Sequence, residues 1–400
     1  MTNRKLSVMA LIALAAAPAV FAADVSLSFG ATVNAWSHKE NSDGTTYDGP
    51  STQSKTNFAG DDCENFIKIS ATGEKAGFYT RLWYGKNNGY TTGLVNAYSN
   101  AAGDGGDGTP LCIFDLEGWV RPFDELKCVI GNNLGYAPLQ ETISWNPIGN
   151  KLNGSTGFRL EYSPNFIPGL TVAAAQAFND MGTDNTYYNA NTTDQDYKAL
   201  GQGGLSVKYT YDMLTFAATG TYNDFLANVG GSYANSWENW SAGGGVQWNG
   251  PFTAVAGASA EIVNSKLYCV QGGVFYTQSV GIFTIKLYDS PIWVSEYVVE
   301  DQFANIAKLD VTAPLTDMIS VDFRAKHAYN RNSGDANGYD TWGSAEQFVQ
   351  GHQSLFLGVL FPCTFGSAQF IPGYYIDMTM NKDADVLKTW YIPLSVKFTF

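Results

Sequence analysis

The chain has 400 residues, of which 45% are hydrophobic and only 15% are charged, and its formal net charge is −14. This negative charge argues against a nucleic-acid partner, because a phosphate binder needs a basic face that releases counterions. The 42 Gly, 23 Tyr, 24 Phe and 10 Trp are typical of strands and turns, so the composition predicts an all-β protein.

Residues 1–22 read as a secretory signal peptide. A charged start with Arg4 and Lys5 precedes an apolar core and a small-residue cleavage site. We therefore expect residues 1–22 to be removed and residues 23–400 to form the mature domain. Beyond the signal, no run approaches 18 apolar residues, which excludes a spanning helix. If the mature chain crosses a membrane, it must do so with strands closed into a barrel.

The first and last predicted strands have the clearest pattern. From Val25 to Ala35 every second residue is apolar, and the residues between them are small or polar. Strict alternation predicts a strand with one face in apolar surroundings. The same alternation runs from Trp390 to Phe400, where the chain stops on an aromatic residue that is in register with the apolar face.

Between these ends, alternating segments recur in pairs that are joined by short turns, which predicts eight hairpins. The predicted pairs are 67–71 with 78–84, 114–120 with 126–130, 158–162 with 170–178, 205–211 with 214–222, 242–248 with 252–260, 270–276 with 283–287, 307–313 with 319–325, and 355–361 with 370–378. With the first and last strands this gives about 18, an even number, as in single-chain outer-membrane barrels.

The connections alternate in length along the chain. Turns of a few residues lie on one side, and long polar segments lie on the other, namely 38–65, 86–111, 132–156 and 329–353. Short turns on one rim and long loops on the opposite rim are typical of a transmembrane antiparallel up-and-down β-barrel. We also expect one or more of the long loops to fold inward and narrow the lumen.

Charged residues separate onto one face of the predicted strands. The apolar face has no Asp, Glu, Lys or Arg in our register, as expected where a basic residue at mid-membrane costs about 2–4 kcal/mol. Eighteen charged residues fall on the other face, and six of them are Lys208, Glu261, Lys286, Lys326, Asp377 and Lys397. The main pore-lining candidates on that face are Lys68, Arg81, Asp115, Glu117, Arg121, Lys127, Arg159, Glu161, Lys308, Asp310, Asp322 and Arg324.

The final strand ending in Phe400 and the hairpin formed by residues 118–123 and 126–131 resemble those of the porin-like outer-membrane β-barrels of double-membraned bacteria. The resemblance implies a place in the cell outer membrane, surrounding lipid, short periplasmic turns, long extracellular loops and passive transport. It also implies that Phe400 is part of the sorting signal that the barrel-insertion machinery reads. No narrower family is indicated by these residues.

Aromatic residues occupy both predicted faces. The inward Tyr79, Trp83 and Trp119 are spaced so that they could guide a sugar by ring stacking, and the alternative is that they pack loops against the wall. The outward aromatic residues near the strand ends predict a membrane-interface girdle and are Trp36, Tyr84, Tyr211, Trp248 and Trp390.

Histidines are the residues that could indicate an enzyme. His38, His327 and His352 all fall at the long-loop rim, and no spacing selects a nucleophile beside them. We therefore expect a protein that is not an enzyme, without a cofactor or a metal, although a metal-binding or pH-responsive pair of His327 and His352 stays open. The Gly-Asp segments 103–108 and 335–340 lack the closing glutamate of a calcium loop, so we interpret them as surface loops.

The five cysteines are scattered without metal-type spacing. Cys112 and Cys128 fall on the apolar face of their predicted strands, where they act as small apolar residues. A bridge between Cys63 and Cys112 is the alternative.

These patterns predict a diffusion channel for small hydrophilic solutes. Without Arg4 and Lys5 the net charge of the chain becomes −16. The eighteen inward charged residues are eleven basic and seven acidic, so the inner wall has a net charge of +4. The loops, turns and termini therefore have a net charge of −20. A cationic wall beneath an anionic rim favours a weak preference for anions, unless an acidic loop sets the constriction. A plugged structural or adhesin barrel on the cell surface and a secreted soluble β-sandwich binding protein are the two alternatives. The sequence is also compatible with a homo-oligomer.

Overall fold

The computed structural model describes residues 24–40, 44–51, 66–84, 111–134, 136, 138–140, 153–178, 200–222, 240–261, 266–294, 302–330, 353–380 and 386–400. The predicted signal peptide, Cys63, His352 and the two Gly-Asp segments lie outside these residues. In the described ranges, no helix is long and apolar enough to cross a membrane.

All the named elements are strands. They are β1 (Asp24–Glu40), β2 (Thr46–Ser51), β3 (Phe66–Thr72), β4 (Ala76–Tyr84), β5 (Leu111–Phe123), β6 (Leu126–Asn133), β7 (Asn153–Tyr162), β8 (Leu170–Phe178), β9 (Leu200–Tyr211), β10 (Leu214–Tyr222), β11 (Trp240–Asn249), β12 (Thr253–Glu261), β13 (Lys266–Val280), β14 (Phe283–Val294), β15 (Gln302–Pro314), β16 (Ser320–Asn330), β17 (Gln353–Leu360), β18 (Cys363–Phe365), β19 (Ala368–Met380) and β20 (Leu387–Thr399).

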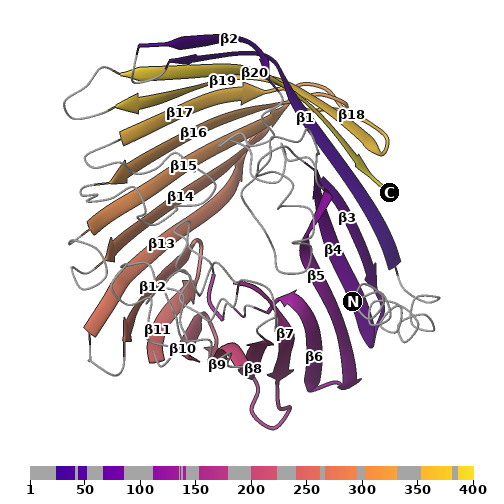
Figure 1. Cartoon of the computed structure of the whole chain (residues 1–400), viewed down its shortest axis with the longest axis vertical. Helices are drawn as coiled ribbons and strands as arrows, with labels where there is room; N and C mark the ends of the chain where they lie inside the picture. The colour runs from indigo at the N-terminus through magenta and orange to yellow at the C-terminus, as the bar shows by residue number, and fades with distance from the viewer. Residues whose placement is uncertain are drawn as a thin grey trace, which may run out of the picture.

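The strands form one closed antiparallel barrel. Each strand from β3 to β17 pairs with the next, β17 pairs with β19, β19 with β20, β20 with β1, and β1 with β3 (Figure 1). The wall therefore has 18 strands, and β2 and β18 are short additions to it. This confirms the predicted fold class and strand number, and the β-sandwich alternative is wrong.

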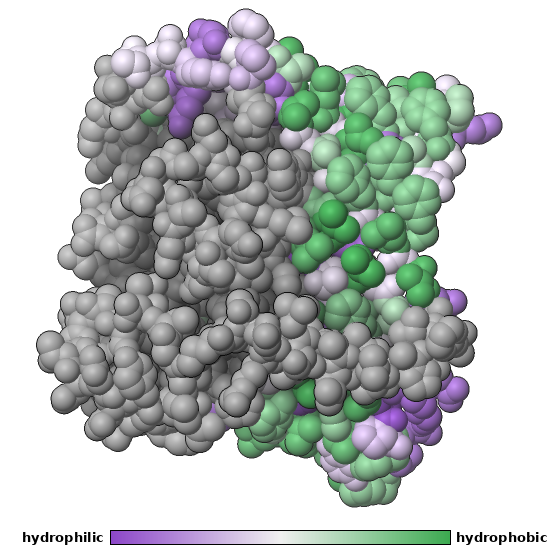
Figure 2. All heavy atoms as spheres, turned by 45° about the vertical axis from the view of Figure 1, so that its right-hand side comes forward, coloured by the Kyte–Doolittle hydropathy of each residue, from purple (hydrophilic) through white to green (hydrophobic). Residues whose placement is uncertain are grey.

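The apolar face of the alternating pattern is the outside of the barrel. On β1 the exposed Val25, Leu27 and Phe29 alternate with residues that face the lumen, of which Thr32 and Asn34 are buried. Figure 2 shows hydrophobic side chains over the wall in view, with hydrophilic ones gathered toward its ends. A surface of this kind is favourable in lipid and unfavourable in water, because apolar area exposed to water costs about 25 cal/mol per Å².

Tight turns close one rim. Asp212 and Met213 alone connect β9 with β10, and Asp212 has a left-handed φ of 51°, which a two-residue hairpin turn requires. Gly281 has a φ of 59° in the equally short turn between β13 and β14. Most of the long connections of the opposite rim lie outside the described residues.

Two strands were absent from the sequence prediction. β2 pairs with the second half of β1, Asn34–Glu40, whereas β3 pairs with its first half, Asp24–Gly30. β18 pairs with the start of β19. Neither segment has the alternation that marks the other strands.

Candidate functional site: the inner wall

Two charged regions of the inner wall face each other. One lies on β5, β6 and β7, and the other lies on β14, β15 and β16. Nine of the 18 pairing steps separate β6 from β15, so the two regions lie on opposite sides of the lumen. We call them the β5–β7 region and the β14–β16 region.

Ion pairs neutralise much of the β5–β7 region. Lys127 Nζ lies 3.6 Å from Glu117 Oε1 and 3.9 Å from Glu161 Oε1. Arg159 Nε donates a hydrogen bond of 2.7 Å to Glu161 Oε1, and Arg159 is only 6% exposed. The positive charges of Lys127 and Arg159 are therefore compensated by neighbouring carboxylates.

Trp119 packs against the wall beside the same ion pairs. A Cβ atom on Gly77 would lie 2.5 Å from the indole, so glycine leaves the room that the ring uses. Arg121 and Lys127 lie over the ring at 5.3 and 5.5 Å from its centroid, which are cation–π distances. The Trp119 ring therefore packs against residues of the wall itself. Tyr79 faces the lumen opposite Glu117.

The β14–β16 region has an excess of positive charge. Lys286, Asp310 and Arg324 form one row across the three strands, and Lys308 pairs with Lys326 in the next row. Arg324 Nη2 lies 3.4 Å from Asp322 Oδ2. The region thus has four basic side chains and two acidic ones, in contrast to the balanced β5–β7 region.

The chain after β6 folds into the lumen. Leu134 is fully buried and packs against Ala175, and Leu139 packs against Ala217 and Val255. Gln140 N donates a hydrogen bond of 2.6 Å to Gln247 Oε1 on β11, while Tyr136 lies under Lys208 Nζ at 5.9 Å. We call Leu134, Tyr136 and residues 138–140 the lumen segment, and for these residues the expectation of an inward-folded loop is confirmed.

The remaining pore-lining candidates are placed by the strand register. Lys68 on β3 and Arg81 on β4 are paired positions of the inner wall, and Arg81 is opposite Asp115 on β5. The side chains of Asp115, Trp83 and Glu261 lie outside the described residues, so the predicted three-ring aromatic track is described only in part.

The expectation that the outer face carries no charged residue is wrong. Asp289 faces outward, because it pairs with Val274, which is on the exposed apolar face. Asn305 Nδ2 donates a hydrogen bond of 2.9 Å to Asp289 Oδ1. The predicted strand stopped at Leu287, whereas β14 continues to Val294, so this aspartate was missing from the predicted face.

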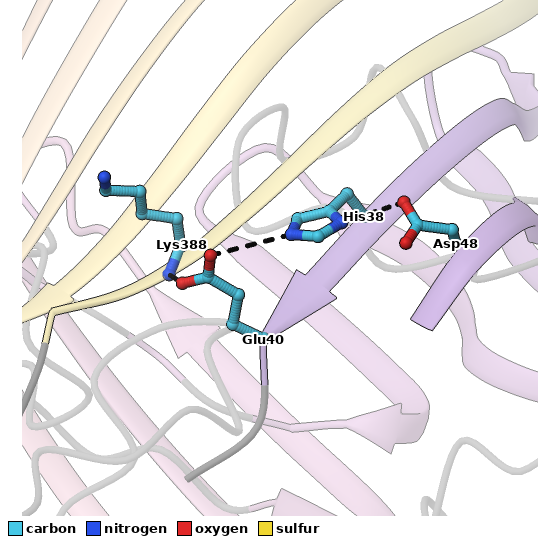
Figure 3. Close-up of polar contacts among 4 residues, drawn as sticks. All are labelled: His38, Glu40, Asp48 and Lys388. Atoms are coloured by element: carbon cyan, nitrogen blue, oxygen red, sulfur yellow. Dashed lines mark hydrogen bonds and ion pairs between the residues drawn. The ribbon is translucent and has the colours of Figure 1, made fainter. Parts of the chain in front are cut away.

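A polar cluster joins β1, β2 and β20 on the outer face of the long-loop rim (Figure 3). His38 Nδ1 lies 2.8 Å from Asp48 Oδ1, and His38 Nε2 lies 3.7 Å from Glu40 Oε1. The backbone N–H of Lys388 donates a hydrogen bond of 2.9 Å to Glu40 Oε2. The His38 ring also stacks on Trp390, with centroids 5.8 Å apart. The contacts of His38 with Asp48 and Trp390 therefore join β1 to β2 and β20.

The described parts of the chain contain no group of three or more His, Cys, Asp or Glu residues that could hold a metal ion. Cys128, Cys269 and Cys363 have free thiols. The proposed bridge from Cys63 to Cys112 and the pair of His327 with His352 involve side chains outside the described residues.

At the short-turn rim, an ion pair links two neighbouring hairpin turns. Lys75 Nζ donates a hydrogen bond to Asp124 Oδ1. This bond lowers the pKa of the Asp124 carboxyl below its ordinary value and raises the pKa of the Lys75 ammonium. Both side chains are exposed, so solvent screens the interaction.

No protein-family model matches the sequence, and no curated protein matches it. Solved structures resemble the fold. Wzi, an outer-membrane protein of Escherichia coli described as involved in group 1 capsule assembly and as a carbohydrate-binding β-barrel, aligns with a TM-score of 0.54 at 11% identity over 98% of this chain and 88% of its own. OccK1 of Pseudomonas aeruginosa aligns with a TM-score of 0.48 at 11% identity, over 94% of this chain and 99% of its own.

An anion-selective porin from Comamonas acidovorans aligns with a TM-score of 0.45 at 11% identity, over 94% of this chain and all of its own. At such low identity a structural likeness concerns the fold and leaves the function open. The chain therefore has the fold of the porin-like outer-membrane β-barrels.

Proposed function

We propose that the protein is a passive diffusion channel of the cell outer membrane for small hydrophilic solutes. The support is the opposite chemistry of the two sides of one closed wall: exposed apolar side chains outside, and ionised side chains inside. In this proposal residues 1–22 direct export, the barrel-insertion machinery assembles the mature chain in outer-membrane lipid, and the barrel performs no enzymatic reaction.

The proposed selectivity rests on the difference in net charge between the two charged regions. In the β5–β7 region Arg159 and Lys127 are paired with glutamates, so they contribute little net field to a passing ion. In the β14–β16 region Lys286, Lys308, Arg324 and Lys326 exceed Asp310 and Asp322. Charges in a confined passage with low-dielectric walls are screened less than charges on exposed loops. We infer a weak preference for anions that arises at the β14–β16 region.

Reversal potentials in planar bilayers under a KCl gradient test this proposal. The wild type is expected to be weakly anion-selective, and the double variant Lys308→Gln/Arg324→Gln is expected to shift toward cations. Lys75→Gln is the matched control, because it removes one charge at the short-turn rim outside the lumen. A cation-selective wild type that the double variant leaves unchanged would contradict the assigned region, and a protein that never conducts would contradict the channel.

A second candidate is a barrel with a filled lumen that binds carbohydrate. The lumen segment favours it, because Leu134 and Leu139 pack directly on the inner wall. Wzi, the structure described as a carbohydrate-binding barrel, shares only the fold. Absence of conductance together with saturable glycan binding would favour this second candidate over the channel.

A further inference from the structure

An aromatic pair stands beside the cations of the β14–β16 region. Phe275 on β13 is paired with Tyr288 on β14, and their rings meet edge to face with centroids 5.7 Å apart. Tyr288 is paired in turn with Lys308 on β15, and Lys308 with Lys326 on β16. Directly paired residues on one face of an antiparallel sheet have Cβ atoms about 4.5–5.5 Å apart. We call Phe275, Tyr288, Lys308 and Lys326 the aromatic–lysine row of the inner wall.

The lumen segment reaches the aromatic end of this row. Phe275 packs against the apolar cluster that Leu139 forms with two residues of β10 and β12. Phe275 and Tyr288 also pack against the buried Ile306 on β15. The apolar contacts are therefore continuous from the lumen segment to the strand that carries Lys308. A solute that passes the edge of the lumen segment here meets apolar atoms and ammonium groups together.

The aromatic pair keeps part of its surface open to the lumen. Phe275 and Tyr288 are half-buried, and Lys286, two residues before Tyr288 on the same face, is exposed. The stacked rings of Phe356 and Tyr375, which lie further along the inner wall, are only 3% and 1% exposed. A solute can therefore contact the first pair of rings, whereas the second pair is covered by protein.

The carboxylates of the β14–β16 region lie in other rows. Asp310 is two residues from Lys308 and shares its row with Lys286 and Arg324. Asp322 is one row nearer the short-turn rim, and its Oδ2 lies 3.4 Å from Arg324 Nη2. The four residues of the aromatic–lysine row thus include two ammonium groups and no carboxylate. An anion is favoured at this row, beside the rings.

We propose that the aromatic–lysine row is a binding subsite for small carboxylates that carry an apolar body. The carboxylate binds at Lys308 and Lys326 through charge-assisted hydrogen bonds, and the apolar body lies on the open surface of Phe275 and Tyr288. A small inorganic anion uses the ammonium groups alone, and a neutral aromatic molecule uses the rings alone. The proposal rests on the proposed channel, because it names the class of anion that the channel favours.

Block of the KCl current in planar bilayers tests the subsite. Benzoate is the probe because it has both chemical parts, whereas acetate lacks the ring and benzamide lacks the charge. The apparent dissociation constant of benzoate is expected to be lower than those of acetate and benzamide by about fivefold or more, since only benzoate makes both contacts. Equal constants for benzoate and acetate would overturn the proposal.

Two tyrosine variants locate the subsite. Tyr288→Ser is expected to raise the constant of benzoate to that of acetate, because it removes a ring and keeps both lysines. Tyr79→Ser is the matched control: Tyr79 faces the lumen from β4, opposite Glu117 and beside cations that glutamates compensate. The control is expected to keep the constant of the wild type. Equal effects of the two variants would count against the assigned row.

A binding measurement separates failure of the subsite from failure of the channel. Equilibrium dialysis of radiolabelled benzoate against the purified barrel in detergent makes the same comparisons without a current. Benzoate binding that Tyr288→Ser abolishes, in a barrel that does not conduct, would support the subsite and contradict the channel. A conducting barrel that treats benzoate and acetate alike would contradict the subsite alone. If Tyr288→Ser fails to fold, Lys308→Met decides, since it should weaken benzoate binding to the level of benzamide.

Discussion

Phe400 and Leu27 exchange two backbone hydrogen bonds. Phe400 N donates to Leu27 O at 2.9 Å, and Leu27 N donates to Phe400 O at 3.0 Å. The last residue of the chain is thereby joined to the first strand of the barrel. Its side chain faces outward, is 67% exposed, and lies parallel to Phe398 with ring centroids 6.3 Å apart.

Replacing Phe400 with Lys is expected to lower the amount of barrel assembled in the outer membrane, because a charge would replace an outward aromatic ring at the seam. Surface abundance and the heat-modifiable gel shift measure the effect. Lys397→Gln, a lumen-facing change on the same strand, is the control and is expected to assemble normally. Equal abundance of the Phe400 variant and the wild type would argue against a sorting role.

Replacing Arg159 with Met is expected to destabilise the barrel. The change removes a buried, charge-assisted hydrogen bond of 2.7 Å, and among the residues that the structure describes it leaves Glu161 with the more distant Lys127. The free energy of unfolding should fall by about 1.5–3 kcal/mol. Urea unfolding in detergent measures it, and the double variant Arg159→Met/Glu161→Gln should recover part of the loss. Additive losses would show that the two side chains are not coupled.

Replacing Gly77 with Ala is expected to displace the Trp119 ring, because the new Cβ would lie 2.5 Å from it. Overpacking of this kind typically costs about 1–3 kcal/mol. Thermal unfolding followed by tryptophan fluorescence reports both the loss of stability and the movement of the indole. Gly272→Ala is the control, since its nearest contact would be an ordinary 3.5 Å. Equal stability of both variants would contradict the packing of Trp119 on Gly77.

Replacing Leu139 with Ser is expected to loosen the lumen segment. Leu139 is buried against Ala217 and Val255, and the loss of a buried leucine costs about 2–5 kcal/mol in a packed site. Single-channel recordings should show a larger or noisier conductance than in the wild type. An unchanged conductance would mean that this segment does not limit ion flow.

The ion pair of Lys75 with Asp124 should contribute more to the stability of the folded barrel at neutral pH than in acid. The folded-state pKa of Asp124 is lowered, mainly by the hydrogen bond from Lys75, so the contribution is complete above the ordinary carboxyl pKa and is lost as the pH falls through the lowered value. Because both groups are exposed, the effect is small. The difference in melting temperature between the wild type and Lys75→Met should shrink toward zero in acid. A difference that is constant with pH would contradict this origin.

The wall of the barrel could be predicted from the sequence because lipid imposes a simple rule on it. A strand with one face in lipid and one in water must alternate, so the segments from Val25 to Ala35 and from Trp390 to Phe400 were recognisable without any partner. The pairing of these two segments across the seam also follows from closure of an even-numbered barrel.

The sequence was less informative where polar residues interrupt the pattern. Asp289 and Pro291 are unfavourable in strands, so the predicted strand ended before them, although pairing with β13 and β15 extends β14 past both residues. The partners of Arg159 depended on the strand register, which alternation alone does not fix. A signal for the lumen segment was present, since Leu134 and Leu139 are apolar residues in a connection that is otherwise rich in polar residues and glycine.

The unequal lengths of β1 and β3 have a consequence for solubility during assembly. β1 has 17 residues and β3 has seven, so the second half of β1 extends beyond the strand that closes the barrel. Without β2, the N–H and C=O groups along Asn34–Glu40 would form an open edge that could recruit a strand from another molecule. β2 covers that edge with a segment of the same chain, so the backbone groups of this part of β1 are not available to a strand of another molecule.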